Sequence, residues 1–471
     1  MAGCLKELSM LVMALLPHKS LVRAWATSGA LELFHLRGHI VHVAMRSSDW
    51  LDVPASIQKD LHFLPLDSLG GGRLRGRVRA ALRLGSMVTR EENSPTYAHK
   101  LGQWRPLLAR AEIAAWRRFR RRVPGGVDGG AMEERLRGLE ARFRPRSEAL
   151  GLIRDLRPDV LLWATLGHQD NDELEVVKAC RAEGVPIVLA WGSWDSASSK
   201  GGNLVRPDRM LVWGEESARH AADWHNCPAG QILVTGPVHW DPYAEPQREP
   251  VGKPSILVAG TSINFWEDEY ACLKMLGRDG LEKGYRVLYR PHPRGAWGWH
   301  PRDMMPEGVV LDGITAAQVW GGRSGWSLHP DDLAGYPALI ASVRCVVAAF
   351  STMTIEAALL GKTPIMVGYG RTRHGPGMAH VHQHYLHMRH VVAWAGVKIA
   401  SEADDLLRFV RHAVEGHYAE DAPGLRQMAL RVARVDGHAR QRAAEALEAL
   451  TSSTRLKSGD SNYATEDRRR T

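Results

Sequence analysis

The sequence predicts an α/β protein with two doubly wound, Rossmann-like domains that face each other across a cleft. Apolar, strand-like runs alternate with helical patterns along most of the 471 residues, which is typical of parallel sheets. A polar, proline-bearing stretch over 241–254 interrupts this alternation and indicates a linker. Polar residues repeatedly follow the predicted strands, at the sheet edge where ligands bind in such folds.

The N-terminal domain is expected over residues 1–245. Its first elements form a strand–helix–strand unit, because the helical pattern stops at Gly38. The first apolar run, Leu8–Leu16, is too short to cross a bilayer and has no clear cleavage site after it, so we interpret it as a buried strand. The predicted strands are Leu8–Leu16, Ile40–Met45, Asp159–Ala164, Val185–Ala190, Arg209–Trp213 and Gln231–Thr235, and the predicted helices are Leu21–Leu36, Asp172–Glu183 and Glu215–Trp224.

An Arg-rich helical insertion is expected in this domain over residues 70–148, and it contributes strongly to the net charge of +9. Its arginines are Arg73, Arg75, Arg77, Arg79, Arg83, Arg117, Arg118, Arg120, Arg121, Arg122, Arg135, Arg137, Arg142, Arg144 and Arg146. They form either a solvated helical face or a surface that attracts an anionic partner, such as a membrane surface or an acidic glycan. A nucleic-acid partner is not expected, because no recognition module accompanies the charge.

The C-terminal domain is expected over residues 250–400 and repeats the alternation. Its predicted strands are Ser255–Ala259, Tyr285–Tyr289, Cys345–Phe350 and Thr363–Val367, and its first predicted helix is Glu267–Gly280. Residues 401–450 are expected to form the C-terminal helices. The polar, charged residues 451–471 predict a disordered tail.

The five cysteines are widely separated and lack the spacing of a zinc site or a disulfide framework. This pattern favours a reducing cytoplasm. The arginines leave open a peripheral position on the inner face of the cell membrane.

The segment 350–364 carries the strongest site signal. A buried strand leads to Ser351 and Thr352, which are good helix N-cap residues, and the helix start that follows can bind a phosphate. Glu356 lies one turn into the helix, where its carboxylate can accept hydrogen bonds from ribose hydroxyls. The alternative is an ordinary cap, with Ser351 or Thr352 satisfying backbone donors only.

A second signal, Arg290-Pro291-His292-Pro293-Arg294, follows another predicted strand. The prolines stiffen this turn and preset the directions of its side chains. His292 can donate to a phosphate oxygen and stabilise a leaving phosphate, while Arg290 or Arg294 can grip one bidentately. Alone, the segment would be better explained as a surface turn with a structural histidine. Its pairing with the Ser351-Thr352 helix start favours a phosphate site.

The catalytic base is expected from the N-terminal domain, where Leu166–Glu173 follows a strand and opens a helix. His168, Asp170 and Asp172 are the candidates, although Asp172 is also a good helix N-cap. The spacing of Asp170 and Asp172 matches a metal-binding Asp-x-Asp triplet, but a single triplet is weak and no metal is expected.

Three further features complete the expected site. The loop after the Val185–Ala190 strand offers Trp194 to stack on a sugar and Asp195 or Lys200 to orient an acceptor. Gly260 and Thr261 can add backbone contacts to the donor. A group of histidines has no acidic partner or metal-ligand spacing nearby, which favours an imidazole-rich lid or solvated loop over a metal cluster. These histidines are His374, His380, His382, His384, His387 and His390.

The His-Pro turn, the Ser-Thr helix start and the following Glu-Ala-x-x-x-Gly-Lys-x-Pro together resemble the nucleotide site of GT-B-type bacterial surface-polysaccharide transferases. These are the CDP-glycerol glycerophosphotransferases, the bacterial sialyl- and polysialyltransferases and the capsule polysaccharide transferases. Val234–Pro237 with Asp241 is similar to a segment of these families and of UDP-N-acetylglucosamine 2-epimerases. The resemblance covers residues 155–370. It implies that His292, Ser351 and Thr352 hold donor phosphates and that Glu356 holds the ribose.

The expected function is therefore transfer of a sugar or glycerophosphoryl group from a CMP-, CDP- or UDP-activated donor to a surface-glycan or lipid-linked acceptor, without a cofactor. An epimerase of similar fold is one alternative, because it would bind the same donor and need no acceptor. A non-catalytic component that binds a membrane surface or a glycan through the arginines is the other.

Overall fold

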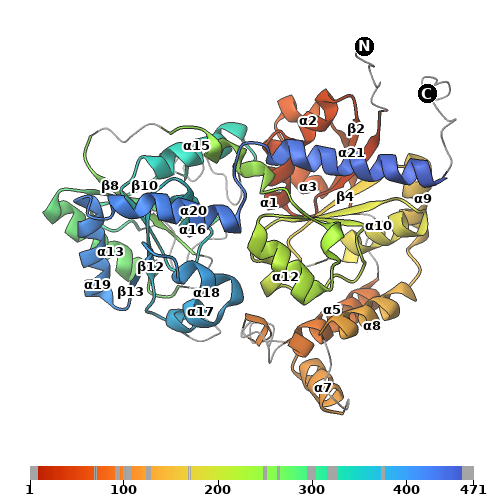
Figure 1. Cartoon of the computed structure of the whole chain (residues 1–471), viewed down its shortest axis with the longest axis horizontal. Helices are drawn as coiled ribbons and strands as arrows, with labels where there is room; N and C mark the ends of the chain where they lie inside the picture. Colours follow the sequence, from red (N-terminus) through yellow and green to blue (C-terminus); the bar gives the residue numbers. More distant parts are fainter. Residues whose placement is uncertain are drawn as a thin grey trace.

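The computed structural model describes residues 9–67, 69, 72–90, 96–98, 101, 109–122, 129–167, 169, 171–247, 252–261, 266–293, 304–315, 327–372 and 377–458. Over these residues the chain forms two parallel β-sheets, one in each half of the molecule, with helices packed around each (Figure 1). This arrangement confirms the predicted fold class of two doubly wound parallel-sheet domains.

The N-terminal sheet has seven parallel strands in the order β3-β2-β1-β4-β5-β6-β7. The strands are β1 (Leu11–Leu15), β2 (Ile40–Met45), β3 (His62–Pro65), β4 (Val160–Thr165), β5 (Ile187–Trp191), β6 (Arg209–Val212) and β7 (Ile232–Val234). Every residue of β4 is buried, because this central strand is covered on both faces. The order reverses between β1 and β4, where Leu15 pairs with Trp163, so the loops after these strands diverge and leave room for a ligand.

Short helices surround this sheet. They are α1 (Lys19–Val22), the π-helix η1 (Arg23–Thr27), α2 (Ala30–Leu36), α3 (Ser47–Trp50), α4 (Ala55–Gln58), α9 (Ser147–Leu156), α10 (Asn171–Ala182), α11 (Ser196–Ser199), α12 (Glu215–His225) and the 3-10 helices η2 (Ala229–Gln231) and η3 (Val238–Ala244). The predicted helix over 21–36 is thus divided into α1, η1 and α2, and Gly29 in the left-handed region (φ 81°) begins α2. The π-helix brings Arg23 towards the other half, as described below.

The C-terminal sheet has six parallel strands in the order β10-β9-β8-β11-β12-β13. The strands are β8 (Ser255–Ala259), β9 (Arg286–Arg290), β10 (Val309–Leu311), β11 (Cys345–Ala348), β12 (Thr363–Val367) and β13 (Lys398–Ala400). The helices of this half are α13 (Glu269–Lys283), α15 (Pro330–Ala341), α16 (Met353–Leu359), α17 (Met378–His384), α18 (Leu386–Val392), α19 (Ala403–Val414), η4 (Ala419–Asp421) and α20 (Ala422–Val432). The order reverses between β8 and β11, whose last residues Ala259 and Ala348 pair. The predicted donor segments after these two strands therefore start side by side.

Between β3 and β4, the described helices α5 (Arg73–Arg90), α7 (Ala109–Arg121) and α8 (Gly129–Ala141) project from the N-terminal half (Figure 1). Ion pairs between buried side chains join α5 to α8 and connect both helices to α10. The pairs are Arg79 with Glu140 and Glu175, Lys178 with Glu140, and both Arg90 and Arg137 with Glu133. A solvated face is therefore wrong for Arg79 and Arg137, whose guanidiniums neutralise buried carboxylates. Arg118, Arg121, Arg135 and Arg142 do lie exposed.

The last helix, α21 (Ala439–Ser458), returns to the N-terminal half and packs against α2 and β4 (Figure 1). Asp241 holds its first turn, because the Asp241 carboxylate accepts hydrogen bonds from the backbone N–H groups of Ala439 and Arg440 at 2.8 and 3.1 Å. The helix passes residue 450, so residues 451–458, expected to belong to a disordered tail, are helical. Residues after 458 lie outside the described part of the chain.

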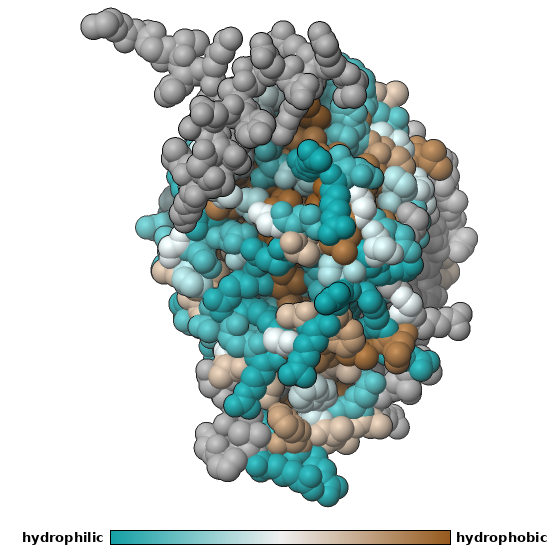
Figure 2. Space-filling model, turned by 90° about the vertical axis from the view of Figure 1, so that its right-hand side faces the viewer, coloured by the Kyte–Doolittle hydropathy of each residue, from teal (hydrophilic) through white to brown (hydrophobic). Residues whose placement is uncertain are grey.

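On the face of the molecule turned to the viewer in Figure 2, hydrophilic residues predominate and hydrophobic ones are scattered. Within the described residues, no helix combines the length and the apolar character that a bilayer crossing requires.

Candidate functional site

The carboxyl-terminal edges of the two sheets face each other, and side chains from both halves meet between them. Trp194, in the loop after β5, donates its indole N–H to the Thr352 hydroxyl after β11 at 3.4 Å. The Tyr243 hydroxyl, in η3, donates to the Glu356 carboxylate on α16. Both contacts join segments that follow strands, as expected for a site formed at facing sheet edges.

The guanidiniums of Arg23 and Arg290 approach one aromatic ring from different halves of the chain. Their Cζ atoms lie 4.7 and 3.5 Å from the centre of the Tyr336 ring. Arg290 Nη1 is buried and has no hydrogen-bond partner among the described residues. The carboxylate of Glu356 lies close enough to interact with both arginines. Two cations facing one carboxylate leave an excess of positive charge, which suits an anion.

Burial shifts the pKa values of two groups in this cluster, Glu356 and Tyr243. Burial raises the pKa of Glu356, while Arg290, the Tyr243 hydrogen bond and Arg23 act in the opposite direction without cancelling the effect. Burial and the neighbouring Glu356 also raise the pKa of Tyr243 well above its ordinary value, so Tyr243 stays protonated and remains the donor in their hydrogen bond.

Ser351 and Thr352 both have partners. The Ser351 hydroxyl accepts the backbone N–H of Met353 at 3.2 Å, which is a capping contact at the start of α16. Thr352 instead uses its hydroxyl to accept from Trp194. The helix α16 thus has a capped start, and Thr352 links it to the N-terminal half.

The loop after β8 lies against the loop after β9. Gly260 donates its N–H to the Arg290 carbonyl at 2.8 Å, and a Cβ at Gly260 would lie only 3.1 Å from the backbone N of His292. The predicted donor residues Gly260, Thr261, Arg290 and His292 are therefore neighbours. Arg294 lies outside the described residues.

Glu269 lies beneath this loop and was not identified from the sequence. Its carboxylate accepts the Thr261 N–H at 2.9 Å and also accepts the Tyr289 hydroxyl, and the residue is 1% exposed. Burial outweighs these hydrogen bonds and raises its pKa to about 7. The one sequence signal for Glu269 was its position in the first turn of a helix that follows Gly-Thr-Ser.

In the N-terminal half, Asp195 is held as an anion. Its two oxygens accept the hydroxyls of Ser193 and Ser199 at 2.5 and 2.6 Å, and Lys200 Nζ lies 3.9 Å away. Burial acts to raise the pKa of Asp195, but Lys200, His387 and the two serines hold it well below its usual range. A carboxylate with so low a pKa is a weak proton acceptor, so it can orient a group more readily than it can remove a proton.

Trp194 was predicted to stack on a sugar. It is instead 6% exposed and meets His387 of α18 edge-on, with ring centres 4.9 Å apart. The Ser198 hydroxyl and His387 Nδ1 also form a hydrogen bond of 3.0 Å. In this domain arrangement Trp194 belongs to the contact between the halves and presents no open ring face.

His168 and Asp170, two of the three candidates for the catalytic base, lie outside the described residues. Gln169 between them is 1% exposed and is bound to Asn203 and to the N–H of Leu204. The segment follows β4, at the reversal of the strand order in the N-terminal sheet. Asp172 lies in the first turn of α10.

A small pocket opens at the ends of β5, β6 and β7, and the sequence did not indicate it. Its lining includes Trp25, Trp191, Trp213 and His239. Burial, followed by the charges of Arg23 and Arg440, lowers the pKa of His239 to about 3, so its imidazole is neutral at pH 7. The lining thus combines three tryptophans with one neutral imidazole.

The described histidines of the group at 374–390 lie on helices and not in a solvated loop. These helices are α17 and α18, and His374 is outside the described residues. His382 and His387 are 2% and 3% exposed, and His382 Nε2 is bound to the Ala349 carbonyl. His380 and His390 are half-buried and His384 is exposed, so the packing of these short helices takes only His382 and His387 into the interior.

Comparisons with solved structures give the same fold over nearly the whole chain. A putative UDP-N-acetylglucosamine 2-epimerase from Listeria monocytogenes aligns with a TM-score of 0.50 at 11% identity, over 94% of this chain and 96% of its own. The glycotransferase of kitacinnamycin gives 0.50 at 13%, over 94% and 99%, and the calicheamicin glycosyltransferase gives 0.50 at 10%, over 94% and 98%. No family model and no curated protein matches the sequence. The chain thus has the GT-B fold that these glycosyltransferases and epimerases share.

Proposed function

We propose that the protein is a nucleotide-donor transferase of the GT-B type, which moves a sugar or glycerophosphoryl group to a surface-glycan or lipid-linked acceptor. The observation that carries the proposal is the pair Arg23 and Arg290 beside Glu356, with the Nη1 atom of Arg290 buried and without a hydrogen-bond partner among the described residues. A donor phosphate would give this atom its missing acceptor and would balance the excess charge.

In the proposed reaction, the bond between the transferred group and the nucleotide phosphate breaks, and a new bond forms to an acceptor hydroxyl. Arg290 and His292 stabilise the charge that develops on the departing nucleotide, and Ser351, Thr352 and Arg294 support the phosphates. A base from the N-terminal half, among His168, Asp170 and Asp172, takes the proton of the acceptor. We expect no metal in this transfer, because the two guanidiniums supply the positive charge.

The donor nucleotide is proposed to carry cytidine or uridine, as the resemblance to surface-polysaccharide transferases implies. Glu356 is the proposed ribose ligand. It would then exchange its hydrogen bond from Tyr243 for one from a ribose hydroxyl, or accept both on its two oxygens. Asp195 and Lys200 are proposed to orient the acceptor.

An epimerase remains the second candidate, because the listerial epimerase aligns as well as the transferases do. Incubation with a UDP-sugar and no acceptor separates the two. Epimerised free donor would identify an epimerase, whereas a transferase leaves the sugar configuration of the donor unchanged.

The test of the donor site is calorimetric titration with CMP, CDP and UDP of the wild type and of Arg290→Met. We expect binding of one of these nucleotides and at least a tenfold loss of affinity in the variant, since a charge-assisted hydrogen bond to phosphate is removed. Arg286→Met, at the other end of β9, is the matched control and should bind normally, because Arg286 is exposed and contacts Ser255. Equal nucleotide affinity in wild type and Arg290→Met would refute the assignment.

We propose a cytoplasmic location, with contact to the inner membrane surface through the exposed arginines of α7 and α8. Sedimentation with anionic vesicles at low and high salt tests this contact. Salt-sensitive binding without any nucleotide binding would instead favour the non-catalytic component.

A further inference from the structure

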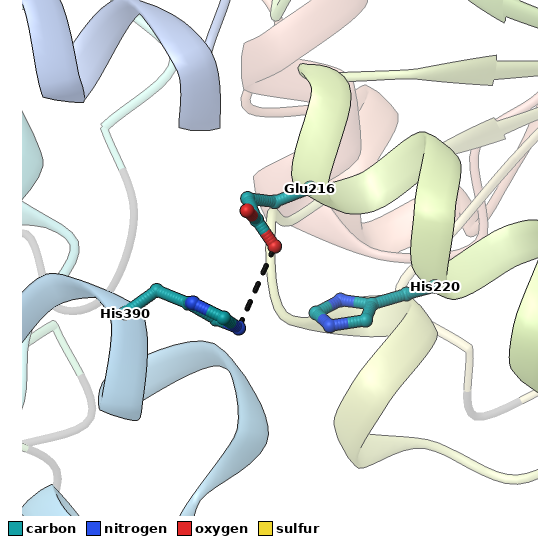
Figure 3. A group of neighbouring side chains, drawn as sticks. All are labelled: Glu216, His220 and His390. Carbon is teal, nitrogen blue, oxygen red and sulfur yellow. Dashed lines mark ion pairs between the residues drawn. The ribbon is translucent and has the colours of Figure 1, made fainter.

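Three potential metal ligands from the two halves of the chain meet beside the Trp194–His387 contact. Glu216 and His220 lie one turn apart on α12, and His390 lies on α18 of the C-terminal half. Figure 3 shows the three side chains pointing toward one another across the space between these helices. Their ligand atoms all lie within 4.8 Å of one another, and no other group of this kind occurs among the residues that the structure describes.

The separations are close to those that a tetrahedral ion requires. Two ligands bound at about 2.0–2.1 Å from such an ion lie about 3.4 Å apart. Glu216 Oε2 and His390 Nε2 are already 3.6 Å apart. The other separations are no longer than 4.8 Å, so side-chain rotation and a small approach of the two helices would complete the geometry.

The environment of His220 supports a ligand at this place. The residue is 3% exposed, and its Nδ1 atom is buried without a hydrogen-bond partner among the described residues. A buried imidazole nitrogen without a hydrogen-bond partner is unfavourable, which makes this ring a candidate for coordination of an ion. Two imidazoles and one carboxylate form a donor set that suits Zn²⁺ and similar divalent transition metals better than Mg²⁺ or Ca²⁺.

Arg219 lies on the outer side of the group and contacts two of the three proposed ligands. Its Nη2 atom lies 2.6 Å from Glu216 Oε2 and 3.0 Å from His390 Nε2. The Arg219 side chain is 50% exposed, so it can turn into solvent at little cost. A guanidinium and a divalent cation would repel each other here, and Arg219 is therefore a competitor of the ion.

From this arrangement we infer that Glu216, His220 and His390 form a binding site for a divalent transition metal, Zn²⁺ in the first instance, that ties α12 to α18. Water would complete the coordination, since three protein ligands leave one tetrahedral position open. Because two ligands come from one half and the third from the other, the ion would stabilise the domain arrangement in which the two halves are in contact. The sequence concealed the site, because the acidic partner of the histidines lies far from them along the chain.

The test uses Co²⁺ as a spectroscopic probe on the untagged full-length protein. We expect visible d–d bands of tetrahedral Co²⁺, without a thiolate charge-transfer band, and displacement of these bands by Zn²⁺. His390→Gln should weaken Zn²⁺ binding at least about 100-fold, measured by competition with a chromophoric chelator. His390 is half-buried, so this variant is expected to fold, and its circular dichroism spectrum checks that.

Two further variants decide between this site and its alternatives. His380 and His384 form another histidine pair on α17, with ring centres 4.2 Å apart, and His380→Gln serves as the matched control that should keep the Co²⁺ bands. Arg219→Ala should bind Zn²⁺ about threefold to tenfold more tightly, because the competing cation is gone. Loss of the bands in His380→Gln but not in His390→Gln, weaker binding in Arg219→Ala, or no Co²⁺ bands in the wild type would each overturn the inference.

Discussion

The hydroxyl of Tyr243 donates a hydrogen bond to the carboxylate of Glu356, and this contact joins the segment after β7 to the helix α16 of the C-terminal half. Tyr243 is 4% exposed, so the bond is shielded from water. The proposed ribose ligand, Glu356, is thus hydrogen-bonded to Tyr243, which lies in the segment that connects the two halves. Binding of a nucleotide at Glu356 would therefore change a contact made by the segment that connects the domains.

Tyr243→Phe should lower the free energy of unfolding by about 1–3 kcal/mol, because it leaves a buried carboxylate without its donor. It should also change the affinity for the preferred nucleotide, since Glu356 becomes free to rearrange. Urea unfolding and calorimetric titration measure the two effects.

Tyr285→Phe is the control for this prediction. Tyr285 donates to Asp279 at 2.7 Å in a comparably buried place, outside the contact between the halves. Its loss should destabilise the protein less, because Asp279 keeps its ion pair with Arg411, and should leave nucleotide affinity unchanged. A matching change of affinity in both variants would show that general destabilisation, and not the Glu356 contact, is responsible.

Glu269 makes the stability depend on pH near neutrality. Its pKa is about 7 in the folded chain against an ordinary value of 4.5, so the folded state binds more protons than the unfolded state between these values. The free energy of unfolding should therefore decrease as pH rises from 4.5 to 7, by at most about 1.4 kcal/mol per pH unit from this group. The difference between wild type and Glu269→Gln in urea unfolding at several pH values isolates the effect.

Glutamine resembles the protonated carboxyl, so Glu269→Gln should be at least as stable as the wild type above pH 7. It should also lose the corresponding slope below pH 7. A wild type and variant with parallel stability profiles from pH 5 to pH 8 would contradict the raised pKa.

Gly260→Ala should disturb the loop that joins the proposed phosphate ligands. Its Cβ would lie 3.0 Å from the Glu269 carboxylate and from the Tyr289 hydroxyl, and 3.1 Å from the His292 backbone, so the loop must shift. We expect a loss of about 1–3 kcal/mol in stability and weaker nucleotide binding. Gly313→Ala, where a Cβ meets nothing within 4 Å, is the control and should behave like the wild type in both measurements.

Removing the charge of the buried Glu133 should lower the free energy of unfolding far more than removing that of an exposed glutamate with a similar pKa. Burial acts to raise the pKa of Glu133, but Arg90, His225 and Arg137 hold it at about 2. Glu133→Gln leaves two buried guanidiniums without their counter-charge and should cost about 3–5 kcal/mol. Chemical denaturation at pH 7 measures this loss.

Glu148 is the comparison for Glu133. Its own backbone N–H, Arg146 and Ser147 lower its pKa to about 2 as well, but its carboxylate is exposed and screened by water. Glu148→Gln should leave the unfolding midpoint almost unchanged. Similar losses in the two variants would mean that the Arg90–Glu133–Arg137 contacts do not hold the helices α5 and α8 in place.

The sequence by itself determined the two parallel sheets, apart from the short strands β3, β10 and β13, because apolar runs and helical periodicity are local properties of the chain. It also located the segments after β8, β9 and β11, since residues that follow parallel strands must gather at one sheet edge. The segments at the ends of β8 and β9 do meet, because the Gly260 N–H donates to the Arg290 carbonyl.

Only the tertiary structure decided which distant side chains meet and which become buried. The return of α21 to the first half, the approach of Arg23 to Arg290, the raised pKa of Glu269 and the pairing of Glu216 with His390 all depend on the packing of elements far apart in the chain. Burial and electrostatic interaction depend on distances in space, and a linear pattern specifies such distances only within a single helix or strand.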